Sequence, residues 1–331
     1  MMNHDLENVL RLAAKLRENL QKCADDPGVD PVHDARTGTR RLQATLEDLV
    51  RESPAGEPGE RVRAAATATM KVLKRIRREA GPVRDLDVHR KLLGKLTRRA
   101  VEPGGQEKSG EAGEQGASLF VPDFLESPEA GMRISGLARQ TDNLDAWLKH
   151  QRSELADGLK GQASDLTEKL DKRLKELEVV LGAKRVRQTR KKPPGVVALD
   201  NFARLASEMQ VLDAGNLHDF RKGAKKARYV AELAAQGDAQ AKQVGETLKK
   251  LQDEIGDWHD WLVLAEEAHS ALGNQGTELI PLIEGERERH FVAAMKMAAK
   301  LRGRLMGEWL ATKPAHGIRR SPIRKNVVGH Q

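Results

Sequence analysis

Apolar residues recur along most of this 331-residue chain at the three- and four-residue spacing of amphipathic helices. Aromatic residues make up only 3% of the chain, which argues against a large β-sheet. The fold class is therefore predicted to be all-α. The pattern predicts helices over residues 6–23, 32–51, 61–80, 85–100, 132–181, 199–212, 217–235, 239–255, 256–271 and 278–310.

Glycine and proline set the expected ends of these helices. Gly81-Pro82 and Gly256 are each expected to separate two helices, and Gly285 is expected to interrupt the last one. Residues 132–181 have the leucine spacing of a coiled coil or a long helical hairpin, in which Gly158 and Gly161 are possible interruptions.

Two of the predicted helices carry the same pattern of charged residues. Each has a histidine, an arginine three positions later, and further cations seven and eight positions later: His33, Arg36, Arg40 and Arg41 in the first, and His218, Arg221, Lys225 and Lys226 in the second. At ~100° per residue, the histidine and the cations at +3 and +7 share one helical face, opposite the apolar residues. Each helix therefore has an apolar face and a basic face.

The match extends into the helix that follows each of these two. Leu73-Lys74-Arg75-Ile76 before Gly81 corresponds to Leu248-Lys249-Lys250-Leu251 before Gly256, and Arg84-Asp85 corresponds to His259-Asp260. Matches in a fixed order predict an internal duplication. We expect two antiparallel helical bundles related by a pseudo-twofold axis, with their basic faces brought together around a central cavity or groove.

The predicted duplication organises residues 5–310 into a single domain. Its N-terminal half spans residues 5–181 and contains a flexible insertion at 101–131, which is rich in Gly, Glu, Gln and Ser. A basic linker at 182–196 leads to the C-terminal half at 197–310. Residues 311–331 are expected to form a disordered, basic tail.

Charge and composition narrow the class of partner. The net charge is +8 and the isoelectric point about 9.5, which favours an anionic partner. Cys23 is the single cysteine, so an internal disulfide and a cysteine-based zinc site are excluded. No apolar run approaches the ~20 residues of a membrane span, and no signal peptide is visible. We expect a cytoplasmic protein without membrane partners or cofactors.

The paired histidine helices resemble the signature helices of the CHAD domain, the conserved-histidine α-helical domain. The resemblance rests on Val32–Leu49 and Leu217–Leu233, and on Leu73–Val88 with its counterpart Leu248–Val263. It implies an all-helical fold of two similar bundles with a basic central cavity or pore. It also implies binding of inorganic polyphosphate and association with polyphosphate granules, where other granule proteins would be possible partners.

The resemblance also implies which residues contact phosphate. By position, these are His33, Arg36, Arg40 and Arg41 in the first half, and His218, Arg221, Lys222, Lys225, Arg228 and Tyr229 in the second. The predicted polyphosphate-binding set also includes further basic residues of the matched segments, namely Lys74, Arg75, Arg84, Lys226, Lys249 and Lys250. Cations ~5–6 Å apart on one helical face can contact successive phosphates. His259 and His89 each occur in only one half and are expected to lie outside this site.

Two other functions fit parts of the pattern. Non-specific binding of nucleic acid needs the same basic surface, but Phe220 and Tyr229 are the only aromatic residues on the two signature helices for bases to stack on. A metal-dependent phosphohydrolase would use the His-Asp pairs that begin at His33, His218 and His259. Neighbours on a helix point ~100° apart, so one such pair does not readily face a single ion. No phosphate-binding glycine loop is present, and we expect a protein that is not an enzyme.

Overall fold

The computed structural model describes residues 4–53, 55–101, 128–182, 193–234 and 237–313. Within these ranges the chain is all-α and contains no strand, which confirms the predicted fold class. The helices are α1 (His4–Asp25), α2 (Val29–Glu52), α3 (Glu57–Val101), α4 (Pro128–Gly182), α5 (Pro194–Glu208), α6 (Leu217–Ala234), α7 (Ala239–Leu272), the 3-10 helix η1 (Gly273–Gln275) and α8 (Leu279–Ala311).

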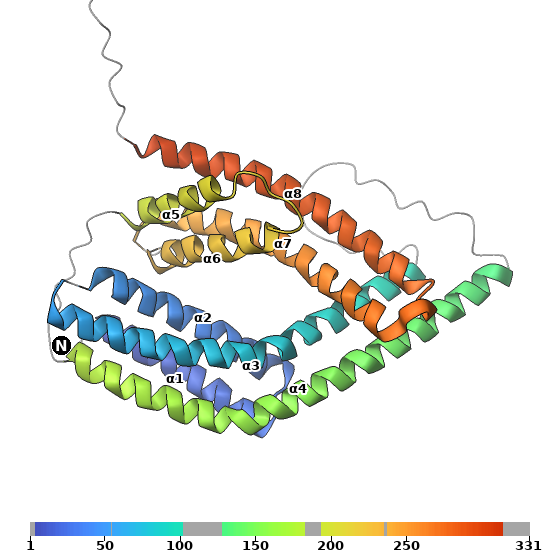
Figure 1. The fold of residues 1–331 in the computed structure, drawn as a ribbon, viewed down its shortest axis with the longest axis horizontal. Helices are drawn as coiled ribbons and strands as arrows, with labels where there is room; N and C mark the ends of the chain where they lie inside the picture. The colour runs from blue at the N-terminus through green and yellow to red at the C-terminus, as the bar shows by residue number, and fades with distance from the viewer. Residues whose placement is uncertain (1–3, 54, 102–127, 183–192, 235–236, 314–331) are drawn as a thin grey trace, which may run out of the picture.

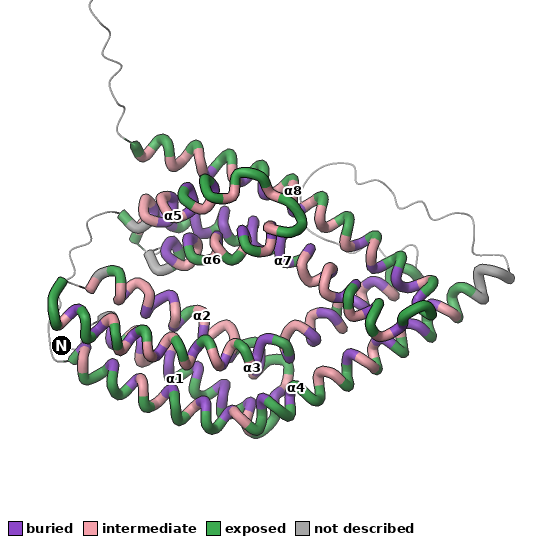
Figure 2. Tube along the Cα trace, viewed as in Figure 1, coloured by how far each residue is buried: buried purple, intermediate pink, exposed green. Residues whose placement is uncertain are grey.

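The helices form two groups, α1–α4 and α5–α8, which lie side by side (Figure 1). Each group has its own apolar core, and residues coloured as buried recur along its helices (Figure 2). A third core joins the two groups at one end. Its residues come from the later part of α3, the first part of α4, the later part of α7 and the start of α8. We call it the joining core.

The long helices run through all the glycine and proline positions that were expected to break them. α3 contains Pro82 in its interior, α7 continues through Gly256, and α8 continues through Gly285. The predicted interruptions at these three positions are therefore wrong. Glycine costs only ~1 kcal/mol in a helix and proline ~3 kcal/mol. Each of these helices contributes to one group's core on one side of the break and to the joining core on the other, and this packing outweighs the local cost.

α4 is a single helix of 55 residues rather than a hairpin. It passes Gly158 and Gly161 without reversing, since Leu148 packs in the joining core while Ala156 and Leu159 pack in the core of α1–α4. In the described part of the chain, every helix is too short or too polar to cross a membrane.

Other predicted boundaries shift by a few residues. α5 ends at Glu208, four residues earlier than expected. The edges of the predicted insertion and linker belong to helices, because α3 reaches Val101, α4 begins at Pro128 and α5 begins at Pro194. Residues 102–127, 183–192 and 314–331, which make up most of the predicted insertion, linker and tail, lie outside the described residues.

Each signature helix packs closely against the helix that precedes it. A side chain at Gly223 of α6 would lie 2.5 Å from the Cδ1 atom of Leu205 on α5, and one at Gly38 of α2 would lie 3.5 Å from the Cδ1 atom of Leu16 on α1. The approach at Gly223 depends on the missing Cβ, whereas the distance at Gly38 is an ordinary van der Waals contact. The apolar faces of α2 and α6 are therefore held against their own groups, and the basic faces are left on the other side.

The joining core predicts where the chain is sensitive to truncation. Replacing Leu144 of α4, which is fully buried in this core, with alanine should lower the free energy of unfolding by about 2–5 kcal/mol. Leu155→Ala on the same helix is the matched control, because Leu155 is 40% exposed, and it should cost no more than about 1 kcal/mol. Urea denaturation of both variants measures the difference. Equal losses would show that the joining core contributes little to stability.

Candidate functional site

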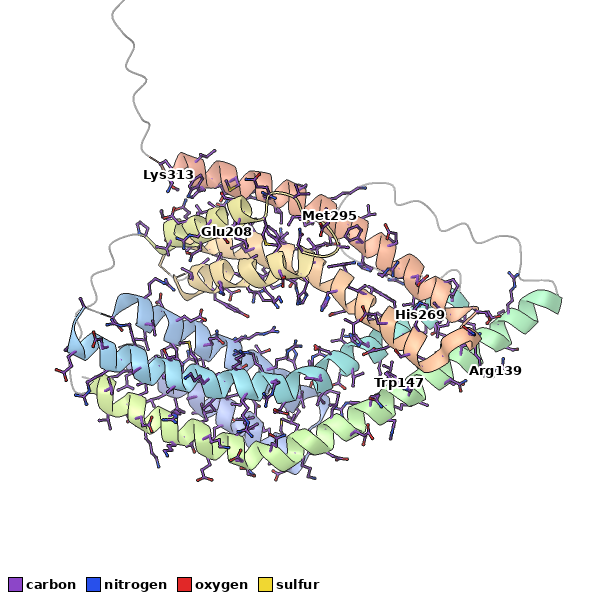
Figure 3. The ribbon with its side chains drawn as sticks, viewed as in Figure 1. Arg139, Trp147, Glu208, His269, Met295 and Lys313 are labelled. Carbon is purple, nitrogen blue, oxygen red and sulfur yellow. The ribbon has the colours of Figure 1, made fainter. Side chains whose placement is uncertain are left out.

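Cations from three helices gather where α2 faces α6, at the boundary between the two groups of helices. They are Arg36 and Arg40 of α2, Arg77 of α3, and Arg221 and Lys225 of α6, and we call them the cationic cluster. All five are half-buried. Figure 3 shows side chains of α2 and α6 extending into the space between the two groups. The sequence predicted that these two basic faces would be close to each other, and the structure places them together.

Burial and mutual repulsion lower the pKa values in this cluster. Burial, with Arg221, Arg40 and Arg36 nearby, lowers the pKa of Lys225 to about 6. Burial beside Arg36 likewise lowers the pKa of Arg40 to about 10, although the Tyr229 hydroxyl partly opposes the effect. At neutral pH, Lys225 is therefore largely uncharged while the arginines around it keep their charge. An anion placed here would favour the charged form of every member of the cluster.

Two contacts between α2 and α3 fix the first half of the site. The Arg36 guanidinium donates from Nη1 to Oδ1 of Asp85 at 2.7 Å, and Arg84 donates from Nε to Nδ1 of His33 at 3.1 Å. His33 is exposed, so its ring lies at the outer edge of the site. Asp85 was not among the predicted site residues, and it holds Arg36 in position.

In the second half of the site, the contact that corresponds to His33–Arg84 joins two histidines. His218 and His259, which correspond to His33 and Arg84, lie with ring centroids 3.9 Å apart. Burial, then the nearby His218 and Arg221, lowers the pKa of His259 to about 4. Burial and the neighbouring Lys222 and Arg221 also lower the pKa of His218. Both shifts favour the neutral form of the imidazole in the unliganded protein.

Arg221 corresponds to Arg36 and is held differently. Its Nε donates to the backbone carbonyl oxygen of Gln252 on α7 at 3.0 Å. Asp260, which corresponds to Asp85, attracts Arg221 electrostatically, but burial of Arg221 has the larger effect and lowers its pKa. In both halves, the arginine at +3 from the histidine is thus anchored to the helix that follows.

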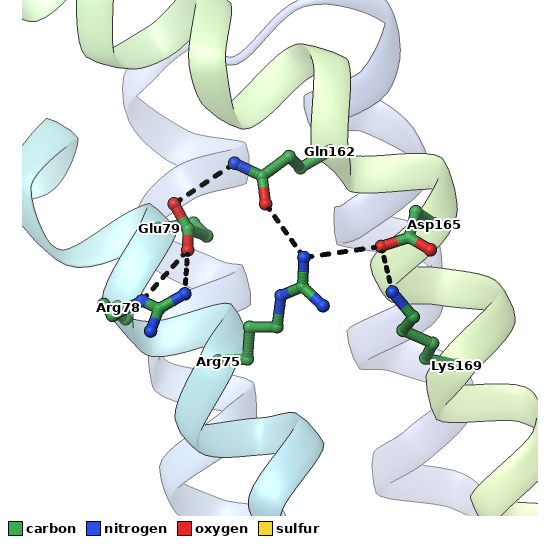
Figure 4. A network of polar contacts seen from close by, with 6 residues as sticks. All are labelled: Arg75, Arg78, Glu79, Gln162, Asp165 and Lys169. Atoms are coloured by element: carbon green, nitrogen blue, oxygen red, sulfur yellow. Dashed lines mark hydrogen bonds and ion pairs between the residues drawn. The ribbon is translucent and has the colours of Figure 1, made fainter.

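Arg75, a predicted site residue, points away from the cationic cluster. Its Nη2 lies 3.4 Å from Oε1 of Gln162 and 3.7 Å from Oδ2 of Asp165, both on α4 (Figure 4). Gln162 also donates to Glu79, and Asp165 also pairs with Lys169. Arg75 therefore belongs to a polar network that joins α3 to α4.

The other predicted residues lie around the cluster or on the outer surface. Arg228 and Tyr229 border the cluster, with the Arg228 guanidinium 4.9 Å from the Tyr229 ring centroid and 3.1 Å from the Glu232 carboxylate. Lys222 pairs with Asp219 at 2.5 Å, and Lys249 with Asp253 at 2.9 Å. These two lysines are exposed, and so are the remaining predicted cations: Arg41, Lys74, Lys226 and Lys250.

Comparing the two matched segments of the sequence overlooked two residues of the site. Arg77 was not predicted because the position that matches it in the second half is Gln252, which is uncharged. A helical-face criterion could have found it, since Arg77 lies seven residues before Arg84 on one face of α3. His259 was expected to lie outside the site, yet its ring contacts that of His218 in a tilted arrangement. No pattern within a single helix signals that contact, because it joins α6 to α7.

The cluster is chemically suited to hold an anion. Arginine offers paired donors that match two oxygens of one phosphate, and it keeps its charge when partly buried. Among the residues that the structure describes, no three His, Cys, Asp or Glu side chains are grouped so as to hold a metal ion.

The comparisons with known proteins agree with the motifs. No curated protein sequence matches this chain. The family described as the CHAD domain matches residues 9–269, which covers both signature helices and the helix after each. That range includes every member of the cationic cluster, and it confirms the resemblance seen in the sequence. The chain belongs to the CHAD domain family.

Proposed function

We propose that this chain binds inorganic polyphosphate at the cationic cluster. One observation carries the proposal: helices from both groups bring five cations together, and the charged groups that most affect Lys225 are all arginines. Membership of the CHAD family supports polyphosphate as the ligand. Polyphosphate carries about one negative charge per phosphorus, so a short length of chain can neutralise the whole cluster.

The site is proposed to be a basic cavity between two bundles that arose by internal duplication and are related by a pseudo-twofold axis. Two sets of corresponding contacts support this arrangement. Positions 33 and 84 touch as 218 and 259 do, and positions 36 and 85 interact as 221 and 260 do. The close glycine contacts of α2 and α6 also fall at corresponding positions, Gly38 and Gly223. A ligand lying between the bundles would be contacted by both basic faces.

Nucleic acid is the alternative polyanion, and it also requires cations. Sequence-tolerant binding of single strands adds aromatic side chains on which bases stack. Of the two aromatic residues on the signature helices, Phe220 is buried in the core of α5–α8, and Tyr229 is the one that lies near Arg40 and Arg77. Polyphosphate has no bases, so it makes no use of such a platform. The composition of the cluster therefore favours polyphosphate.

In this proposal the chain acts by binding rather than by catalysis, and it resides at cytoplasmic polyphosphate granules. Ion pairs with arginine and lysine account for attachment to a long polyanion, and no reaction step is required.

Charge reversal tests the cluster. Arg40→Glu combined with Lys225→Glu should weaken polyphosphate binding by more than ~100-fold, because each charged contact contributes about 1.5–3 kcal/mol. Helical content by circular dichroism should stay unchanged, since the empty cluster is self-repulsive and the new carboxylates lie beside arginines. Arg61→Glu with Lys242→Glu, at exposed positions on α3 and α7, makes the same change in net charge and should weaken binding only modestly. Equal losses in both variants would refute a localised site.

Competition separates polyphosphate from nucleic acid. Long-chain polyphosphate should displace a labelled single-stranded RNA at equal phosphate concentration, and RNA should fail to displace labelled polyphosphate. Affinity for polyphosphate should also fall steeply with salt, with a log–log slope of about −3.5 if five cations are neutralised at ~0.7 per contact, as for a single strand. Fluorescence anisotropy at several salt concentrations measures both quantities. Preferential retention of RNA would favour the nucleic-acid alternative.

The expected pH dependence of polyphosphate affinity follows from the lowered pKa of Lys225. Its pKa of about 6 in the free protein leaves it mostly neutral at pH 8, and a bound polyanion raises that pKa, so binding takes up a proton. Affinity should therefore rise as pH falls from 8 to 6, by up to ~10-fold per pH unit for one coupled proton, and this contribution should level off below about pH 6.

Lys225→Arg tests whether Lys225 is the group that takes up the proton. Arginine stays charged throughout this range, so this variant should flatten the dependence of polyphosphate affinity on pH between pH 8 and 6. Lys242→Arg, at an exposed position on α7, should keep the pH dependence of the natural chain. An unchanged profile in Lys225→Arg would show that another group takes up the proton.

A further inference from the structure

Gly256 of α7 lies directly beneath the guanidinium of Arg221. A Cβ atom at this position would stand 2.4 Å from Nη2, 3.0 Å from Cζ and 3.2 Å from Nε of Arg221. All three distances are shorter than the ~3.5–4 Å of an ordinary contact. The guanidinium therefore packs against the backbone of α7 in the space that a side chain at position 256 would occupy, and we call this space the notch.

The notch and one hydrogen bond together determine where the charge of Arg221 sits. Nε is fixed by the carbonyl oxygen of Gln252, one helical turn before Gly256. The side chain is thus held by the hydrogen bond from Nε and by the notch at Gly256. Within the described residues, its Nη1 and Nη2 donors make no hydrogen bond, which leaves them available to a ligand.

The corresponding glycine of the first half makes no such contact. A Cβ at Gly81 of α3 would meet nothing within 4 Å, although Gly81 occupies the same place in its repeat as Gly256. Arg36, the counterpart of Arg221, is instead anchored by the Asp85 carboxylate. The two repeats therefore hold equivalent arginines by different means, and the glycine matters in only one of them.

We propose that Gly256 is a positioning residue, whose missing side chain seats Arg221 against α7 so that its terminal nitrogens bind the anion in the cationic cluster. The inference rests on the proposed function for the identity of the anion. The notch keeps the Arg221 guanidinium from turning toward other partners. Asp253, Asp257 and Asp260 of α7 all attract Arg221 electrostatically. A guanidinium displaced from the notch by roughly 1 Å, the shortfall from an ordinary contact, is free to turn toward these carboxylates.

Gly256→Ala and Gly81→Ala form a matched pair of variants. Gly256→Ala should weaken polyphosphate binding by roughly 10-fold or more, the effect of losing one charged contact. Gly81→Ala should bind like the natural chain, with a melting temperature equal or higher, because alanine is the better helix former.

A double-mutant cycle with Arg221→Ala distinguishes positioning from a general structural effect. If Gly256 acts through Arg221, adding Gly256→Ala to Arg221→Ala should change affinity by less than about 2-fold, the limit of ordinary additivity. An equal loss of affinity in both backgrounds would overturn the proposal. So would normal binding by Gly256→Ala.

A second measurement needs no ligand. The Nε–H of Arg221 donates to the Gln252 carbonyl oxygen, so its exchange with solvent, followed by NMR, should be slow in the natural chain and in Gly81→Ala but fast in Gly256→Ala. Slow exchange in all three proteins would refute the positioning role of Gly256. Failure of the natural chain to bind polyphosphate would instead refute the proposed function, while the exchange result would still test whether Gly256 positions Arg221.

Discussion

Repulsion among half-buried cations is the constraint on which the rest of the structure depends. Bringing Arg40, Lys225 and their neighbours together lowers their pKa values, and each lowered pKa measures free energy spent in the unliganded fold. The apolar cores must supply that energy. The core of each group holds its signature helix from behind, and the joining core prevents the two basic faces from moving apart. The long uninterrupted helices α3 and α7 serve this purpose, because each contributes to both its own core and the joining core.

Arginine and lysine side chains have different roles in this protein according to whether an Asp or Glu carboxylate lies beside them. Arg75 has Asp165 within 3.7 Å and joins α3 to α4, and Lys249 has Asp253 within 2.9 Å on its own helix. Exposed ion pairs of this kind contribute little stability, and they also leave less charge for a ligand. Arg40 and Lys225 are instead surrounded mainly by other cations. At Arg40 and Lys225, the scarcity of nearby carboxylates, rather than the number of cations on a helix, is therefore what leaves positive charge available to a ligand. Arg36 and Arg221 differ, since each has a carboxylate of the following helix nearby.

The sequence predicted the basic faces well because helical periodicity relates positions on one helix without knowledge of the fold. It placed Arg36 and Arg40 on one face, and Arg221 and Lys225 on another. Contacts between helices were beyond its reach, since the partners of Arg75 lie about 90 residues further along the chain. The helix ends near Gly81, Gly256 and Gly285 were wrong for a related reason. Local propensity differs by ~1–3 kcal/mol, and packing on both sides of each position is decided by the tertiary structure.

Matched positions in the two halves of the site make different contacts, which the matched sequence pattern would not suggest. In the first half, Arg36 pairs with the Asp85 carboxylate and Arg84 donates to His33. In the second half, the neighbours of Arg221 include Lys225, His218 and His259, whose pKa values are all lowered. Histidine at position 259, where the first half has Arg84, puts two imidazoles in contact. A polyanion bound across both halves would therefore raise pKa values in the second half that burial and neighbouring cations have lowered.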